Sequence, residues 1–296
     1  MFFSLMHSIG IGVLTGLFSS AIYALMASGL TLTYGVMNII NVAQGILVIL
    51  GAYLSYALEQ SLHLDLFLGL VVSTPLLFVL GLLIERVFLR RLKNDRVTLS
   101  ILVLFAIAQV IEGVLSLIFT TDSVSLHAWY LDATVQVGDF YVPVISFFAF
   151  LLSMVLLIGL FLLVYRTGFG AALRASMQHR EAAQLIGIDV TQVQMVTFAL
   201  GVALCAAGGM AYGATSAFNP ASSYDLISRL LTIIVLGGKG SLKGTLVASV
   251  VMLVIGNVTA LVWSPVWSSS VFFALLIVLL LLRPQGLFGQ REGRMQ

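Results

Sequence analysis

Long apolar segments, separated by short polar ones, follow one another along the whole chain. They lie at about 9–34, 38–57, 66–88, 97–119, 142–165, 191–217, 230–237, 244–263 and 267–282. A helix needs about 20 apolar residues to cross the hydrocarbon core of a bilayer, and most of these segments reach that length. Because lipid offers the backbone no hydrogen-bond partners, each segment must satisfy its own backbone as a helix. The pattern predicts an all-α polytopic membrane protein with about eight transmembrane helices.

Segment 230–237 is too short to span a membrane alone, and it runs directly into the glycine-rich sequence GGKGSLKG at 237–244. Glycine interrupts a helix more easily than the apolar residues before it do. We therefore expect a short re-entrant or broken helix here. The whole chain, residues 1–296, is interpreted as a single transmembrane domain.

The composition agrees with this interpretation. Of the 296 residues, 60% are hydrophobic and only 9% are charged, against about 25% charged residues in a typical soluble domain. These values exclude a disordered chain and an ordinary soluble enzyme. The net charge of +2 is too small to indicate a nucleic-acid partner. Cys205 is the only cysteine, so no intramolecular disulfide can form.

The basic residues gather in alternate connecting segments, and this pattern orients the chain. Every Lys and Arg except Arg229 lies in 85–96, in 166–190, in the glycine-rich loop or in the C-terminal tail. Cytoplasmic loops are enriched in Lys and Arg, so these segments, the C-terminus among them, are predicted to be cytoplasmic. The N-terminus is then provisionally outside. This alternation requires segment 230–237 to cross, or nearly cross, the membrane.

The longest loop on the predicted external side is 120–141. It contains three aspartates and no Lys or Arg. Two interpretations stay open: a docking surface for an external partner, or a solvated connector with aromatic residues at the membrane interface.

The sequence carries no catalytic signature. Gly238-Lys239 is followed by Gly240 and lacks the upstream glycine of a phosphate-binding loop. The four histidines are scattered and form no HExxH motif, and there is no GxSxG nucleophile elbow. We therefore expect no catalytic residues, no metal site and no cofactor on this chain, and a membrane-embedded enzyme is the least favoured function.

Glu112 is the one charged residue well inside an apolar segment. An ionisable side chain at membrane depth is costly and indicates function by default. Three interpretations compete: a proton-coupling acid, a neutral carboxyl that bonds a neighbouring helix, and a residue close to the external interface.

Polar residues also cluster where helices are expected to break. Broken helices expose backbone groups at membrane depth that can meet a polar solute. The candidates for a translocation path are Asn38, Asn41, Gln44, Gly237, Gly238, Gly240 and Ser241. The alternative is that small residues let helices pack closely, and Gly12-x-x-x-Gly16 fits that alternative better.

The predicted cytoplasmic loop 166–190 contains a short helix from Arg174 to Ile186, which ends at Gly187, a natural C-cap. Its apolar residues Met177, Leu185 and Ile186 are flanked by His179, Arg180 and Glu181. On spacing alone, the helix docks on another protein or is a plain loop helix.

Three stretches resemble a known family. Glu181-Ala182-Ala183-x-x-x-Gly187 resembles the EAA loop of ABC-importer permeases. GLTLTYGVMNIINVAQGILVILGAYLSY at 29–56, and LTIIVLGGKGSLKGTLVAS at 231–249 with the ending LLRPQGLFG, resemble the branched-chain amino-acid permeases of the LivH type. The resemblance covers nearly the whole chain. One departure is the sequence IDVTQVQ after Gly187, which lacks the proline of the fuller EAA pattern.

The resemblance implies the permease subunit of a binding-protein-dependent ABC importer in the bacterial inner membrane. Its implied partners are two cytoplasmic ATPase subunits that bind ATP and Mg, a second permease, related or identical, and an external solute-binding protein. The implied ATPase-coupling residues are Arg174, Arg180, Glu181, Ala182, Ala183 and Gly187. Leucine, isoleucine and valine are the implied substrates, and urea or short-chain amides are the alternative. From another class, a proton-coupled secondary transporter using Glu112 remains the competing hypothesis.

Overall fold

The structure is a computed structural model that describes residues 2–92, 96–126, 134–137, 140–238, 240–283 and 286–288. In chain order its elements are α1 (Phe2–Met37), α2 (Gln44–Leu62), α3 (Leu66–Val87), η1 (Leu89–Arg91), α4 (Arg96–Phe119), β1 (Thr134–Val137), β2 (Phe140–Pro143), α5 (Val144–Arg166), α6 (Gly168–Gln178), α7 (Arg180–Leu185), α8 (Val190–Thr215), α9 (Ser222–Gly237), α10 (Leu242–Val262) and α11 (Pro265–Leu282). Within the described residues, eight helices are long and apolar enough to cross a membrane. The predicted all-α polytopic class is confirmed.

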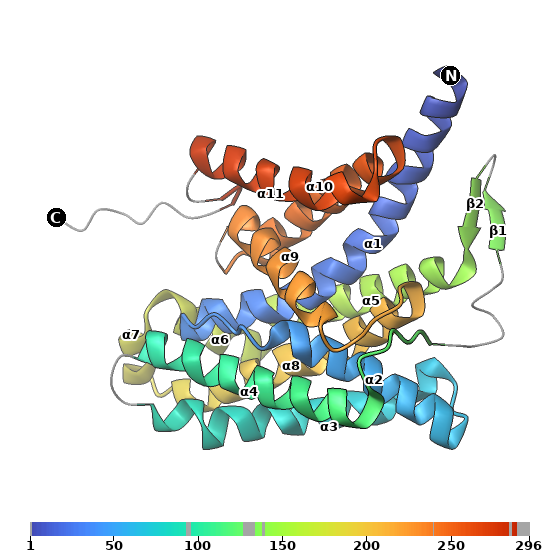
Figure 1. Cartoon of the computed structure of the whole chain (residues 1–296). Helices are drawn as coiled ribbons and strands as arrows, with labels where there is room; N and C mark the ends of the chain where they lie inside the picture. The colour runs from blue at the N-terminus through green and yellow to red at the C-terminus, as the bar shows by residue number, and fades with distance from the viewer. Residues whose placement is uncertain are drawn as a thin grey trace.

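The loop predicted to be external contains an element that the sequence pattern did not predict. Strands β1 and β2 form an antiparallel hairpin in which Val137 pairs with Phe140. Residues 127–133 and 138–139 of the predicted loop 120–141 lie outside the described residues. In Figure 1 the hairpin lies at the right end of the molecule, and α6 and α7 lie at the left end. The predicted external and cytoplasmic loops are therefore at opposite ends of the bundle.

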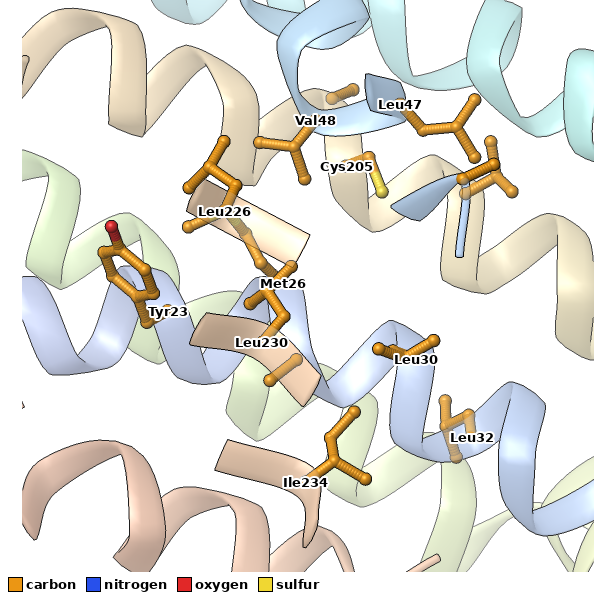
Figure 2. Packing of buried hydrophobic residues seen from close by; sticks show 14 of the residues in the cluster. Tyr23, Met26, Leu30, Leu32, Leu47, Val48, Cys205, Leu226, Leu230 and Ile234 are labelled. Carbon is orange, nitrogen blue, oxygen red and sulfur yellow. The ribbon is translucent and has the colours of Figure 1, made fainter. Parts of the chain in front are cut away.

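Helices α1, α2 and α8 form the centre of the bundle, and small residues set their spacing. A Cβ on Gly201 of α8 would lie 2.8 Å from the Gly29 carbonyl oxygen of α1. A Cβ on Gly209 would lie 2.7 Å from the backbone nitrogen of Ala52 on α2. Backbones that approach this closely are typical of membrane helix pairs. The buried Cys205 lies in the same packed core, beside Val48 and Leu47 (Figure 2).

The long helix α1 also packs closely on α10. Cβ atoms on Gly12 and Gly16 would lie 2.8 and 2.7 Å from the Cα atoms of Val258 and Val254. The packing interpretation of Gly12-x-x-x-Gly16 is confirmed.

Helix α9 has 16 residues, Ser222–Gly237, and begins well before the predicted segment 230–237. The apolar pattern missed residues 222–229 because polar side chains occupy their exposed face. Leu226, Leu230 and Ile234 are on the buried face, and Figure 2 shows them in the cluster that contains Met26 of α1. At 1.5 Å per residue α9 is about 24 Å long, somewhat less than the roughly 30 Å hydrocarbon core.

The two ends of α9 lie near opposite ends of the bundle. Just before α9, Phe218 pairs with Val124 of the 120–126 segment in an antiparallel bridge. Just after α9, Gly240 lies beside Met177 of α6. The short helix therefore passes from the side of the external loop to the side of α6, as the charge pattern requires.

Candidate functional site

The loop 166–190 folds into two helices, so the prediction of one helix from Arg174 to Ile186 is wrong. The first helix, α6, starts at Gly168, where the Thr167 hydroxyl oxygen accepts a hydrogen bond from the Gly170 N–H at 3.1 Å. His179 then adopts an extended conformation with φ −147° and separates α6 from α7. Gly187 has φ +86°, and its N–H bonds the Gln184 carbonyl at 3.0 Å. The predicted helix end at Gly187 is thus confirmed, because glycine adopts the left-handed conformation without strain.

Helix α7 presents an apolar surface outside the bundle. Leu185 is 88% exposed and Ile186 is 75% exposed. Arg180, Glu181 and Ala182 are exposed as well, whereas Ala183 is buried. Two large aliphatic side chains that no other part of the described chain covers favour a surface that a partner covers.

Arg174 has a different environment from the exposed coupling residues. Its guanidinium donates to the Val164 carbonyl at the end of α5 and lies 5.5 Å from the centre of the Tyr165 ring. An arginine that bonds the last carbonyls of a helix satisfies acceptors that the helix leaves open. Arg174 therefore fixes the position of α6 relative to α5. The prediction that these six residues bind an ATPase remains a prediction.

Met177 of α6 joins three segments that are distant in the sequence. Its Cε atom occupies the space where a Cβ on Gly35, near the end of α1, would lie. A Cβ added to Gly240 would lie 3.5 Å from the same Cε atom and 3.4 Å from the Gly35 Cα. We call Gly35, Met177 and Gly240 the junction. It connects the helices of the loop 166–190 with α1 and with the turn between α9 and α10.

The glycine-rich turn at the junction is tightly built. Gly238 and Gly240 have φ +97° and +78°, values that favour glycine. The Ser241 hydroxyl oxygen caps α10 by accepting from the Gly244 N–H at 3.1 Å. A Cβ on Gly237 would lie 2.5 Å from the Gly244 carbonyl carbon. The three glycines among the predicted path residues therefore shape the backbone of the turn, and the Ser241 side chain caps α10; a role of these four residues in a path remains a prediction.

The C-terminal segment completes the junction. The Leu287 N–H donates to the Leu236 carbonyl at 2.7 Å, and the Phe288 N–H donates to the Gly237 carbonyl at 3.2 Å. These bonds satisfy two acceptors at the end of α9. The stretches around 29–56, 231–249 and 281–289, which carried the family resemblance, thus meet in space.

The other path candidates lie where α1 ends and α2 begins. Asn38 is exposed, with φ +54°, and residues 38–43 separate the two helices. The Asn41 side-chain amide donates to the Gln44 oxygen at 2.9 Å, and both side chains are buried. Gln44 in turn donates to the carbonyls of Met26 and Gly201, each at 3.3 Å. Gln44 thus ties α2 to α1 and α8.

Glu112 has a neighbour that the sequence did not reveal. Its carboxylate accepts a hydrogen bond from the Tyr224 hydroxyl of α9 at 2.7 Å, and Gln109 donates to the same hydroxyl at 2.9 Å. Of the three interpretations of Glu112, the structure therefore contains the hydrogen bond to a neighbouring helix. Tyr224 was missed as a functional candidate, and its polar spacing with Ser228, one helical turn apart, was the available signal. Met177 was predicted only as part of the apolar patch of the loop helix, and its contacts with Gly35 and Gly240 were not predicted. Among the described residues, no group of three or more His, Cys, Asp or Glu can hold a metal ion.

Comparison with known proteins covers nearly the whole chain. Residues 12–281 match the family described as branched-chain amino acid transport system, permease component. The LivH permease protein of the high-affinity branched-chain amino acid transport system of Escherichia coli K12 is 26% identical over 290 residues, 91% of this chain and 92% of that protein. The probable branched-chain amino acid transport permease LivH of Methanocaldococcus jannaschii is 31% identical, over 79% of this chain and 75% of that protein. The BraD permease protein of Pseudomonas aeruginosa is 26% identical over 95% of each chain. No solved structure matches significantly.

Proposed function

Since the chain belongs to the family of branched-chain amino acid transport permeases, we propose that it is the membrane subunit of an ATP-driven importer in the bacterial inner membrane. The observation that carries this proposal is the family match over residues 12–281, which includes all or most of each of the eight candidate spans. We infer leucine, isoleucine and valine as the substrates, because the relatives named above are described as permeases for branched-chain amino acids.

The proposed importer has several subunits. Two ATPase subunits bind ATP and Mg at the cytoplasmic face, a second permease pairs with this chain, and a solute-binding protein delivers the amino acid outside. The exposed Leu185 and Ile186, next to Glu181, support α7 as the docking surface for one ATPase. The C-terminus is proposed to be cytoplasmic, because the segment 286–288 bonds the end of α9 that lies next to α6.

Coupling in this proposal runs through the junction. Movement of a docked ATPase displaces α7 and α6, and Met177 transmits the displacement to Gly35 and Gly240. These contacts lie at the ends of α1 and α9, so both helices respond together. A switch between two states needs a free-energy difference between them, and ATP binding and hydrolysis on the partner subunits provide it.

Co-purification tests the proposal. The complex extracted in mild detergent is expected to contain an ATPase in stoichiometric amount, and Glu181→Lys is expected to remove it. Asp122→Lys is the matched control, because it reverses a charge on an exposed residue of the loop 120–141, at the other end of the bundle. The complex with this variant should still contain the ATPase. Uptake of leucine into vesicles should require ATP and resist a protonophore. A chain that purifies alone, and transports under a proton gradient in a Glu112-dependent way, would refute the importer.

A further inference from the structure

Most exposed helix faces of this molecule are apolar, as contact with lipid requires. Leu76 of α3 is 50% exposed, Val110 of α4 is 65% exposed and Ile158 of α5 is 58% exposed. An exposed polar helix face is therefore unusual in this molecule.

Helix α9 has such an exposed polar face. Opposite its buried Leu226 and Leu230, Tyr224 is 48% exposed, and the Asp225 side chain is 52% exposed. Together with side chains of α4, they form a polar band of six residues: Gln109, Glu112, Tyr224, Asp225, Ser228 and Arg229. The ionised members are costly in contact with lipid. The band must therefore face water or another protein surface.

Internal bonds preorganise the band. Tyr224 donates to Glu112 at 2.7 Å and accepts from Gln109 at 2.9 Å, so that one hydroxyl links α4 to α9. Ser228, one turn further along α9, donates to the Tyr224 carbonyl at 2.8 Å. The bonded polar groups thus have fixed positions on an exposed surface.

The charges of the band do not cancel. Arg229 is paired with Asp225 at 2.8 Å, and it also contacts Ser269 and the Phe272 ring of α11. Within the part of the chain that the structure describes, Glu112 accepts a hydrogen bond from the Tyr224 hydroxyl and forms no ion pair. One carboxylate of the band therefore remains without a positive partner, and it complements a cationic group.

We propose that this band faces the aqueous path and that Glu112, held by Tyr224, transiently binds the ammonium group of the transported amino acid. The inference rests on the proposed function, and it places solute contact on the exposed face of α9. The predicted path residues Asn41 and Gln44, in contrast, are buried and bonded to each other. A carboxylate that accepts a hydrogen bond from a tyrosine offers its remaining lone pairs to an ammonium donor.

Cysteine labelling in the assembled transporter tests this inference. The native Cys205 is 0% exposed, so background labelling is low. Ser228→Cys places a thiol on the band, and Leu76→Cys places one on a 50% exposed apolar face. Charged methanethiosulfonates react with the thiolate, which forms only in contact with water. We expect Ser228→Cys to react in membrane vesicles and Leu76→Cys not to react.

The charge of the reagent reports on Glu112. Relative to its rate with a free thiol in solution, a trimethylammonium reagent is expected to react about fivefold faster than a sulfonate reagent at Ser228→Cys, because one uncompensated carboxylate attracts the cation and repels the anion. Adding Glu112→Gln should bring the two relative rates together, whereas Glu112→Asp should keep them apart. Leucine moved per ATP should fall at least about fivefold in Glu112→Gln and less in Glu112→Asp.

Two results would overturn the inference. An unreactive Ser228→Cys shows that lipid or the second permease covers the band. If both reagents react equally fast relative to their rates with a free thiol, Glu112 does not attract cations to the band. Ala221→Cys, on an exposed residue at the start of α9, is the second reporter if Ser228→Cys fails to assemble. Loss of ATP-driven uptake by the unmodified complex would instead refute the proposed function, so the two failures are distinguishable.

Discussion

Replacing Gly35 by alanine tests whether α6 passes its motion to the helices of the bundle. The added methyl group would overlap Met177 Cε and would lie 3.5 Å from Gly240 Cα. The terminal atoms of a methionine are flexible and can move aside. The substitution therefore pushes Met177 away from the junction and leaves the backbone in place.

Two other glycines calibrate the expected effect on stability. A Cβ on Gly159 of α5 would meet no neighbouring atom within 4 Å, so Gly159→Ala should stabilise the helix by about 0.5–1 kcal/mol. Gly209→Ala meets the backbone of α2 at 2.7 Å from the Ala52 nitrogen, and it should cost about 1–3 kcal/mol or more. Gly35→Ala combines a gain in helix propensity with the cost of moving Met177, and we expect its free energy of unfolding to stay within about 1 kcal/mol of the unmodified chain.

The functional effect should nevertheless be large. Coupling free energies between sites are typically about 1–3 kcal/mol, which corresponds to at least about fivefold. In proteoliposomes with the ATPase and the loaded binding protein, Gly35→Ala should move at least about fivefold less leucine per ATP than Gly159→Ala does. Equal transport per ATP in these two variants, at comparable thermal stability, would refute the role of Met177 as the link.

Two further predictions concern single contacts. Gln44→Leu removes the donor to the Met26 and Gly201 carbonyls, which keep their bonds within α1 and α8, and it also removes the acceptor of the buried Asn41 side-chain amide. Leaving that buried donor unpaired should lower the unfolding free energy by about 1–3 kcal/mol, as measured by denaturation in detergent, and an unchanged value would contradict the assigned bonds. Leu185→Ser combined with Ile186→Ser changes residues that are 88% and 75% exposed, so the thermal stability of the permease should stay the same. The affinity of the ATPase for the permease, measured by titration, should fall by about tenfold or more. An unchanged affinity would show that α7 is not the docking surface.

The membrane fold was predictable from sequence because lipid imposes a strong rule on every spanning segment. Apolar length alone located the eight candidate spans. The start of α9 was not predictable by the same rule, since Tyr224, Asp225 and Ser228 are polar on a helix whose other face is buried. A search for apolar length misses a helix that has a polar face. The hairpin between Thr134 and Pro143 was missed for a different reason, because its strands are only four residues each and give too short a pattern to recognise.

The sites were predictable in part, and the limit was three-dimensional contact. The segment Glu181–Gly187 and the glycine turn were marked by local sequence. The break at His179 was not, since its extended backbone follows good helix formers without a proline or glycine. The junction required residues 35, 177 and 240 to be brought together, and no spacing in a single sequence shows that contact.

Helix α9 connects the two sites that the structure suggests. The junction lies just beyond its Gly237 end, and the polar band begins at Tyr224, 13 residues earlier, or about 20 Å along the axis. Near the Ser222 end of α9 the chain is held by the Phe218–Val124 bridge and by the Ser222 N–H, which donates to the Asn219 side chain at 2.9 Å. A helix fixed at one end and displaced at the other tilts as a unit. In the proposed mechanism, displacement of Gly240 through Met177 changes the position of Tyr224 relative to Glu112 on α4, so that one movement of α9 connects the docked ATPase with the proposed ammonium site.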